Sequence, residues 1–262
     1  MRSFYYALPV RSITGFLMSY FNEKRTEDVK FAAVDALNIN KDSNVLEIGY
    51  GRGNGSFQKY MFQGLAIVLD RLRSGKGHAF GIENSLYLEE VTQKRFILEI
   101  KDDKVLHLER AILLNTLPYP TDFFDGIFHV DSYYFWGKDL YPVCHDLWRV
   151  LSPGGTMVCG MELNRLRRLE EWGIIQECQY NPIRYLSVLE LAGFTNVEMK
   201  YLKIDGDREI QLIKASKPES KPEYFDPQAQ LEKLEAEIKR DLLVERMIKD
   251  GKPVYDLKKK DL

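Results

Sequence analysis

The sequence predicts a doubly wound α/β fold, in which a mostly parallel sheet carries helices on both faces. First, an apolar run over residues 45–48 leads into glycines at every second position, which is typical of a buried strand that ends in a tight turn before a helix. Second, strand-like runs then alternate with segments of helical periodicity. Third, residues 195–202 and 209–214 flank Asp205-Gly206, a dipeptide typical of β-hairpins. We therefore expect a mostly parallel sheet that is followed by a terminal β-hairpin.

Each expected element follows from the apolar spacing and from the residues that interrupt it. Strands are expected over residues 45–48, 78–83, 104–109, 123–131, 156–161, 195–202 and 209–214. Helices are expected over residues 56–72, 85–96 and 184–192, and apolar faces of helical spacing also cover 13–21 and 27–37. Residues 227–249 are expected to form a charged amphipathic helix after a linker that contains Pro218 and Pro222.

Composition and charge exclude several classes of protein. A net charge of −2 over 262 residues gives no electrostatic reason to expect nucleic acid or an anionic membrane as the main partner. No run approaches the ~18 apolar residues of a transmembrane helix. The cysteines, Cys144, Cys159 and Cys178, show no C-x-x-C spacing, which argues against a zinc site or a disulfide framework and indicates a reducing compartment. We expect these cysteines to be small core residues, with no metal site and a cytoplasmic location.

The glycine turn distinguishes between two kinds of nucleotide site. The dinucleotide-binding fingerprint is G-x-G-x-x-G, but Asn54 and Ser56 occupy the places where its third glycine would fall in the two possible registers. The turn instead reads E-x-G-x-G-x-G, with Glu47 two residues before Gly49. This departure, together with the terminal hairpin, disfavours a nucleotide-binding oxidoreductase.

Four ordered motifs resemble those of the class I S-adenosylmethionine (AdoMet)-dependent methyltransferases, in the broad type 11-like group. They are the glycine turn at 47–53, G-I-E-N-S at 81–85, L-P-Y-P at 117–120 followed by F-F-D-G at 123–126, and R-V-L-S-P-G-G at 149–155. The resemblance covers residues 44–160 and implies a Rossmann-like fold, AdoMet as cofactor and transfer of its methyl group. In such a fold the sheet has seven strands, mostly parallel, and the terminal hairpin inserts an antiparallel last strand. The resemblance also implies that the Pro-Gly-Gly turn leads from a helix into the fifth strand.

The resemblance further assigns a set of cofactor-binding residues. The acid at Glu47 would serve the amino-acid end of AdoMet, and the acid at Glu83 would accept the two ribose hydroxyls. Residues that follow the third strand would contact the adenine. The expected set is Glu47, Gly49, Tyr50, Gly51, Gly53, Glu83, Asn84, Arg110 and Ala111.

Candidates for chemistry on the methyl acceptor lie at and after the fourth strand, as the family geometry implies. Positioning supplies most of the rate gain in methyl transfer from a sulfonium, so a general base is optional. The candidates for proton removal are His129, Asp131, Tyr133 and Tyr134, although His129 can equally be a satisfied core histidine and the tyrosines can simply pack. The aromatic cluster suits a small-molecule acceptor that is apolar or cationic. A catalytically silent AdoMet-binding or interaction module on the same fold is the alternative.

We divide the chain into an N-terminal helical cap (1–43), a methyltransferase domain (44–216) and a linker with an amphipathic helix (217–262). The cap is expected to close over the cofactor. Its acid-free first 22 residues also resemble a mitochondrial transit peptide, which leaves a mitochondrial location as the alternative. The tail helix either packs on its own domain or makes a weak contact with a second copy or a protein partner.

Overall fold

The computed structural model describes residues 11–52, 64–111, 113, 116–204 and 208–219. Within this part, seven strands form one sheet with the order β3-β2-β1-β4-β5-β7-β6. The strands are β1 (Val45–Ile48), β2 (Ala79–Glu83), β3 (Leu106–Arg110), β4 (Phe124–Val130), β5 (Leu151–Met161), β6 (Thr195–Ile204) and β7 (Arg208–Ser216). β1 pairs in parallel with β2 and β4, whereas β7 runs antiparallel between β5 and β6. The predicted mixed sheet with an antiparallel terminal strand is confirmed.

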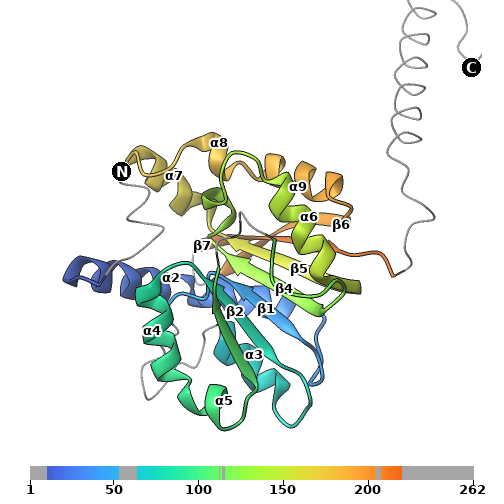
Figure 1. Ribbon diagram of the computed structural model, residues 1–262. Coiled ribbons are helices and arrows are strands. Elements are labelled where there is room, and N and C mark those ends of the chain that lie inside the picture. The colour runs from blue at the N-terminus through green and yellow to red at the C-terminus, as the bar shows by residue number, and fades with distance from the viewer. Residues whose placement is uncertain (1–10, 53–63, 112, 114–115, 205–207, 220–262) are drawn as a thin grey trace, which may run out of the picture. The chain divides into compact units, whose positions relative to one another are not determined.

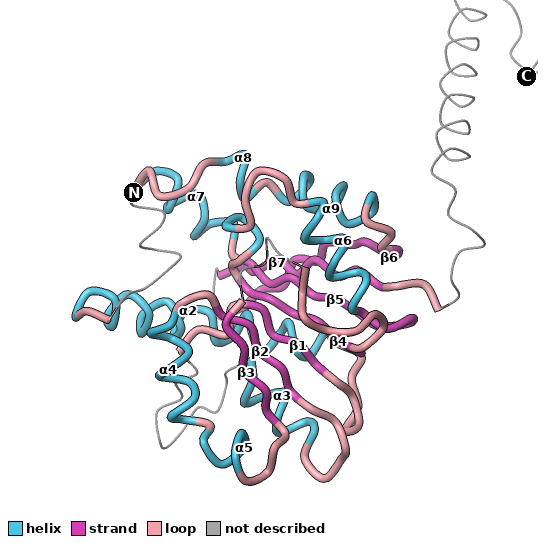
Figure 2. Tube along the Cα trace, in the orientation of Figure 1, coloured by secondary structure: helices cyan, strands magenta, loops and turns pink. Residues whose placement is uncertain are grey.

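Helices cover both faces of this sheet. The helices of the described part are α2 (Ile13–Ala36), α3 (Gly64–Leu72), α4 (Leu86–Arg95), α5 (Ile97–Lys101), α6 (Tyr141–Val150), α7 (Leu163–Glu171), α8 (Glu177–Tyr180) and α9 (Pro182–Leu191), with a 3-10 helix η1 (Tyr133–Phe135). α2 and α3 contact each other and the sheet, and α6 and α9 do the same on the opposite face (Figure 1). In Figure 2 the parallel strands β3, β2, β1 and β4 lie next to one another between these layers. Burial on both faces is the usual state of a parallel sheet.

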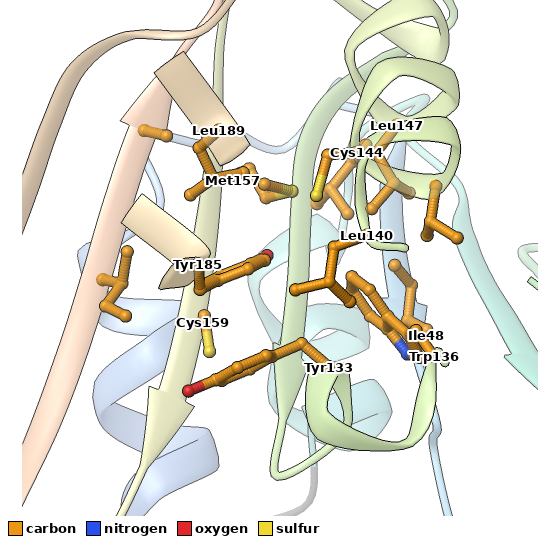
Figure 3. Close-up of a cluster of buried hydrophobic side chains, with 14 of the residues drawn as sticks. Ile48, Tyr133, Trp136, Leu140, Cys144, Leu147, Met157, Cys159, Tyr185 and Leu189 are labelled. Carbon is orange, nitrogen blue, oxygen red and sulfur yellow. The ribbon is translucent and has the colours of Figure 1, made fainter. Parts of the chain in front are cut away.

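Alternate strand residues divide between two hydrophobic cores. Ile127 and Met157 belong to the core under α6 and α9, whereas Phe128 and Val158 belong to the core under α2 and α3. This division follows from the two-residue period of a strand, in which successive side chains point to opposite faces. Figure 3 shows part of the first core, where Leu147 of α6 and side chains of α9 meet the sheet.

Several elements differ from the prediction. The two apolar faces before the first strand belong to one continuous helix, α2, because residues 22–26 contain neither glycine nor proline to separate them. β5 begins at Leu151, which pairs with Phe124, and an irregularity follows before Thr156 pairs with Gly126. The Pro-Gly-Gly turn is therefore an irregularity within the strand rather than the turn before it. The short helices α5 and α8 and the charged helix α7 were not predicted.

Some expectations fall on residues outside the described ranges: Gly53, the start of the helix expected from residue 56, Asp205-Gly206 and the tail helix over 227–249. Cys144 and Cys159 are buried as predicted. Cys178 is exposed, so the prediction of a core cysteine is wrong there. Among the described helices, none is long and apolar enough to cross a membrane. The same residues contain no group of three side chains arranged to hold a metal ion.

Candidate functional site

The carboxyl ends of three neighbouring strands bring the candidate residues to one edge of the sheet. Ile48 of β1 pairs with Ile82 of β2 on one side and with His129 of β4 on the other. Glu83 ends β2 and Asp131 follows β4, so these two acids flank the glycine turn that follows β1. Open α/β sheets bind their ligands at this edge, where the strand order reverses.

The turn after β1 requires glycine at the two positions that the structure describes. Gly49 and Gly51 have φ angles of +73° and +70°, a left-handed conformation that residues with a Cβ disfavour. The N–H of Gly49 donates to the carbonyl of Ile82 at 2.8 Å, which ties the turn to β2. A Cβ on Gly49 would lie 3.9 Å from the Cβ of Ser132. The bare backbone of the turn therefore runs close to the segment that follows β4.

Backbone N–H groups hold the carboxylate of Glu83. Its Oε2 accepts from Gly51 at 3.2 Å, and its Oε1 accepts from Asn84 at 2.9 Å and from Ser85 at 3.0 Å. Burial raises the pKa of this carboxyl, and the three N–H groups act in the opposite direction. Because each carboxylate oxygen can accept two hydrogen bonds, Oε1 is fully used by Asn84 and Ser85, and Oε2 keeps the capacity to accept one further donor. A ribose hydroxyl would satisfy that capacity.

Glu47 is a buried acid that pairs with a lysine from a distant helix. Its Oε1 accepts from Nζ of Lys30 in α2 at 3.1 Å, and the side chains of Glu47 and Lys30 are only 2% and 7% exposed. Burial raises the pKa of Glu47 to about 7, although Lys30 lowers it and the N–H of Leu65 makes a smaller contribution in the same direction. Its Oε2 is buried and makes no hydrogen bond within the described part of the chain. An unpaired buried acceptor costs about 1–3 kcal/mol, so a donor from a ligand would be favoured here.

Two glycines leave room for side chains of the site. A Cβ on Gly64 would lie 2.4 Å from Oε2 of Glu47, and a Cβ on Gly81 would lie 2.6 Å from the ring of Tyr50. Tyr50, expected among the cofactor-binding residues, is buried, and its ring packs on Gly81. Its carbonyl accepts from Lys30 at 3.2 Å. The structure therefore places the backbone of Tyr50, rather than its side chain, at the turn.

Lys30 and Arg52 join α2 to the glycine turn, and the sequence analysis singled out neither. A guanidinium nitrogen of Arg52 donates to Oγ of Ser19 at 3.0 Å and to the hydroxyl of Tyr87 at 3.2 Å. The same guanidinium lies 4.3 Å from the centre of the Phe16 ring, within the range of a cation–π contact. The available signals were the position of Arg52 inside the glycine turn and the position of Lys30 among apolar residues of a helix.

Asp131 forms a second buried ion pair, on the β4 side of the glycine turn. Its Oδ2 accepts from Arg165 of α7, and its side chain is 9% exposed. Arg165 also donates to Oδ1 of Asn22 in α2 at 2.9 Å and lies 3.5 Å from the hydroxyl of Tyr134. Oδ1 of Asp131 is buried without a hydrogen bond in the described part of the chain. Asp131 also has a φ of +55°, an uncommon backbone conformation that is often found at functional sites.

His129 and Tyr133 lie in the core rather than at the edge. The two ring nitrogens of His129 are 2.8 Å from the hydroxyl of Tyr185 and 2.9 Å from Oγ of Ser132, and burial lowers the pKa of the imidazole to about 3. The hydroxyl of Tyr133 donates to the carbonyl of Tyr180. Its ring stacks on Tyr185 with 4.3 Å between the centroids, and Figure 3 shows both rings in the core. These contacts favour structural roles for His129 and Tyr133.

The residues expected near the adenine lie one strand further from β1. Arg110 ends β3 and pairs in register with Glu83. Arg110 is exposed, whereas Glu109 and Ala111 are partly buried. The structure therefore brings these residues to the same sheet edge as Glu83.

Comparisons with known proteins agree with this architecture. A family described as "Methyltransferase domain" matches residues 46–159. A SAM-dependent methyltransferase from Aquifex aeolicus is 18% identical with a TM-score of 0.55, over 73% of this chain and 92% of that one. A chain from a complex that contains the Haloferax volcanii Trm112 methyltransferase activator is 17% identical with a TM-score of 0.59, over 83% and 97%. Geranyl diphosphate C-methyltransferase from Streptomyces coelicolor A3(2) is 14% identical with a TM-score of 0.53, over 79% and 85%. A search of curated protein sequences gave no match.

At these identities the solved structures establish the fold alone. The family match over residues 46–159 supports methyl transfer as the activity. The residues present also fit AdoMet, which is the cofactor of this family. Glu83 offers an acceptor for a hydroxyl, Oε2 of Glu47 offers an acceptor for an ammonium, and Gly49 and Gly51 leave the backbone open to a ligand. Residues 46–159 therefore match a methyltransferase domain, and the fold, this match and the residues at the sheet edge together support AdoMet-dependent methyl transfer.

Proposed function

We propose that this methyltransferase acts on a small-molecule acceptor that is held beside Asp131. The observation that carries the proposal is the convergence of three buried acids, Glu47, Glu83 and Asp131, around the bare turn at Gly49. Glu83 would hold the ribose of AdoMet and Glu47 its amino-acid end. Arg110 and its neighbours would lie on the adenine side, and Asp131 would face the acceptor.

AdoMet supplies a methyl group on a sulfonium, whose sulfur keeps the electron pair of the broken C–S bond when the methyl carbon bonds to a lone pair of the acceptor. The chain has to align that acceptor and exclude water. Arg165 engages one oxygen of Asp131, which leaves the other oxygen to accept a hydrogen bond from the acceptor. Because the guanidinium of Arg165 compensates its charge, Asp131 is better suited to orienting the acceptor than to removing its proton.

The same geometry supports a small acceptor that carries a hydroxyl or an amine. Such a group can donate to the unpaired oxygen of Asp131, and the tyrosine hydroxyl of Tyr134 lies in the same cluster. The Asp131 side chain is almost fully buried, which favours a compact molecule over a folded protein or a nucleic acid. The net charge of −2 points in the same direction.

Calorimetry and methyl release test the proposal. We expect heat on titration with AdoMet or S-adenosylhomocysteine and none with NAD. Charge-assisted hydrogen bonds contribute about 1.5–3 kcal/mol, so Glu83→Ala should weaken AdoMet binding about tenfold to a hundredfold. Glu190→Ala, which removes an exposed carboxylate from α9, is the control. Heat with NAD alone would contradict the assignment of the cofactor.

The acceptor is tested with AdoMet labelled in its methyl group and fractionated small-molecule extracts. Label should pass to a small molecule with the wild type, and Asp131→Asn should reduce the transfer while leaving AdoMet binding within about threefold. Label on protein alone would overturn the small-molecule acceptor. AdoMet binding without transfer to any fraction would favour the catalytically silent module.

The organisation of the chain belongs to the same proposal. We retain the cap (1–43), catalytic (44–216) and tail (217–262) parts, with Lys217 at the start of the tail packed on the catalytic part. The proposal also keeps the cytoplasmic location and a weak contact of the tail with a second copy or a protein partner. A solved structure similar to this chain is a complex with a methyltransferase activator, which supports a protein partner. Light scattering of the full chain, alone and after removal of residues 220–262, tests self-association.

A further inference from the structure

We propose that Lys30 and Glu47 together recognise the zwitterionic amino-acid end of AdoMet, with Lys30 binding its carboxylate and Glu47 its ammonium. The inference rests on the proposed function and deepens it. A free amino-acid group carries one positive and one negative charge side by side. The buried pair between α2 and β1 presents the two opposite charges, 3.1 Å apart, at the start of the glycine turn.

Lys30 lies between the acid before the glycine turn and the turn itself. Its ammonium bonds to Oε1 of Glu47 and to the carbonyl of Tyr50 at 3.2 Å, and it lies 4.0 Å from where a Cβ on Gly51 would be. It therefore lies against the same turn whose backbone would admit the cofactor. The charge of Glu83 also acts on Lys30, so the ammonium lies within electrostatic reach of both cofactor acids.

Lys30 and Glu47 each keep hydrogen-bonding capacity that no described residue uses. An ammonium has three donor hydrogens, and two partners account for two of them in the described part of the chain. On the other member of the pair, Oε2 of Glu47 is buried without a hydrogen bond among the described residues. One donor and one acceptor are thus left over on adjacent groups of opposite charge. A carboxylate and an ammonium on one carbon atom would use both.

We do not expect the cofactor to displace Lys30 from Glu47. Its neighbour Val29 packs so closely on β5 that a Cβ on Gly160 would lie 2.6 Å from Cγ1 of Val29. Ala33 and Val34, on the following turn of α2, are fully buried. Moving the ammonium away would leave the buried carboxylate of Glu47 without its partner, which is strongly unfavourable. The cofactor therefore binds beside an intact pair.

The test compares three ligands that differ at the amino-acid end. AdoMet has both charged groups there, and decarboxylated AdoMet lacks only the carboxylate. 5′-Methylthioadenosine lacks the whole amino-acid side chain and, as a neutral thioether, also the sulfonium charge. We expect the wild-type chain to bind AdoMet at least about tenfold more tightly than decarboxylated AdoMet, the effect of one charge-assisted hydrogen bond. In Lys30→Met this preference should fall to less than about twofold, whereas the Kd for 5′-methylthioadenosine should change by less than about threefold. The ratio of Kd values is the diagnostic quantity, because both charged ligands keep the ammonium.

Two controls separate recognition from a structural role. Lys24→Met removes an exposed lysine from the same helix and should leave the ratio unchanged, and Lys30→Arg should retain most of the preference. If Lys30→Met does not fold, the double variant Lys30→Met/Glu47→Gln removes both buried charges and should still lose the preference. A wild-type chain without the preference, or a Lys30→Met variant that keeps it, would overturn the inference. Failure of the wild type to bind AdoMet at all would instead overturn the proposed function.

Discussion

Replacement of Lys217 by methionine should destabilise the fold, although the sequence places this residue at the start of a linker. Its side chain is 6% exposed. The ammonium donates to the carbonyl of Trp148 at 2.8 Å and to that of Leu151 at 2.7 Å. It also pairs with Asp122 at 2.5 Å and lies 4.0 Å from the centre of the Trp148 ring. Lys217 thus caps the C-terminal end of α6, where helix carbonyls lack partners.

The magnitude follows from these contacts. A hydrogen bond from a charged donor contributes about 1.5–3 kcal/mol, and a cation near a helix C-terminus about 0.3–1 kcal/mol. Asp122 is one-third exposed, so its ion pair adds little. The bonds share one ammonium and are not additive, so we expect Lys217→Met to lower the free energy of unfolding by about 3 kcal/mol. For a domain of this size, that corresponds to a fall in Tm of about 6–12 °C.

Thermal melting of the full-length chain measures this effect. Lys203→Met, which removes an exposed lysine from β6, is the matched control and should melt within about 1 °C of the wild type. A chain that ends at Ser216 should show the loss, and a chain that ends at Glu219 should not. Equal melting of these two truncated chains, or an unchanged Tm in Lys217→Met, would refute the assignment of Lys217 to the packed domain.

Three further predictions use other contacts of the structure. Gly64→Ala would put a Cβ 2.4 Å from Oε2 of Glu47, so AdoMet affinity by calorimetry should fall at least about tenfold; unchanged affinity would count against Glu47 as a ligand. The pKa of His129 is lowered from 6.5 to about 3 in the folded chain, so below pH 6.5 the unfolded chain binds a proton that the folded chain does not. The free energy of unfolding should therefore fall by about 1.4 kcal/mol per pH unit as the pH drops below 6.5. Denaturant midpoints measure this slope, and the same slope in His129→Asn would refute the prediction. Arg149→Met removes bonds of 3.0 and 2.8 Å to the carbonyls of residues 117 and 119, so Tm should fall by about 4–8 °C, and an unaltered melt would contradict it.

The elements that were predicted correctly are those whose signals are local. The apolar run before Gly49 and the acid that ends the next strand predicted β1, β2 and the position of Glu83, since strand ends and tight turns depend on neighbouring residues. The paired terminal strands were predicted for the same reason. Helix α7 was missed although Leu163, Leu166 and Leu169 recur at helical spacing, because the segment around them is mostly charged and has little apolar content.

The parts of the site that were missed come from distant helices. Lys30 and Arg165 are charged residues on helices, and such residues are usually exposed to solvent. Only the tertiary fold brings Arg165 to Asp131, 34 positions away in the chain, and Lys30 to Glu47. A charged residue among the apolar positions of a helix was the one available indication, and it does not identify the partner. His129 shows the converse limit, because its position near the carboxyl end of β4 suggested a role in chemistry, whereas its full burial supports a role in packing.

Helix α2 connects the cofactor side of the site to the acceptor side. Lys30 contacts the acid before the glycine turn, Ser19 binds Arg52 within the turn, and Asn22 binds Arg165, the partner of Asp131. One rigid helix therefore holds both buried ion pairs, and a shift of α2 would disturb both together. The apolar residues toward its N-terminus, among them Phe16, remain about half exposed, so this half of α2 is held by polar and cation–π contacts with Arg52. The C-terminal half is part of the core, so any closure of α2 over the cofactor would have to involve its N-terminal half.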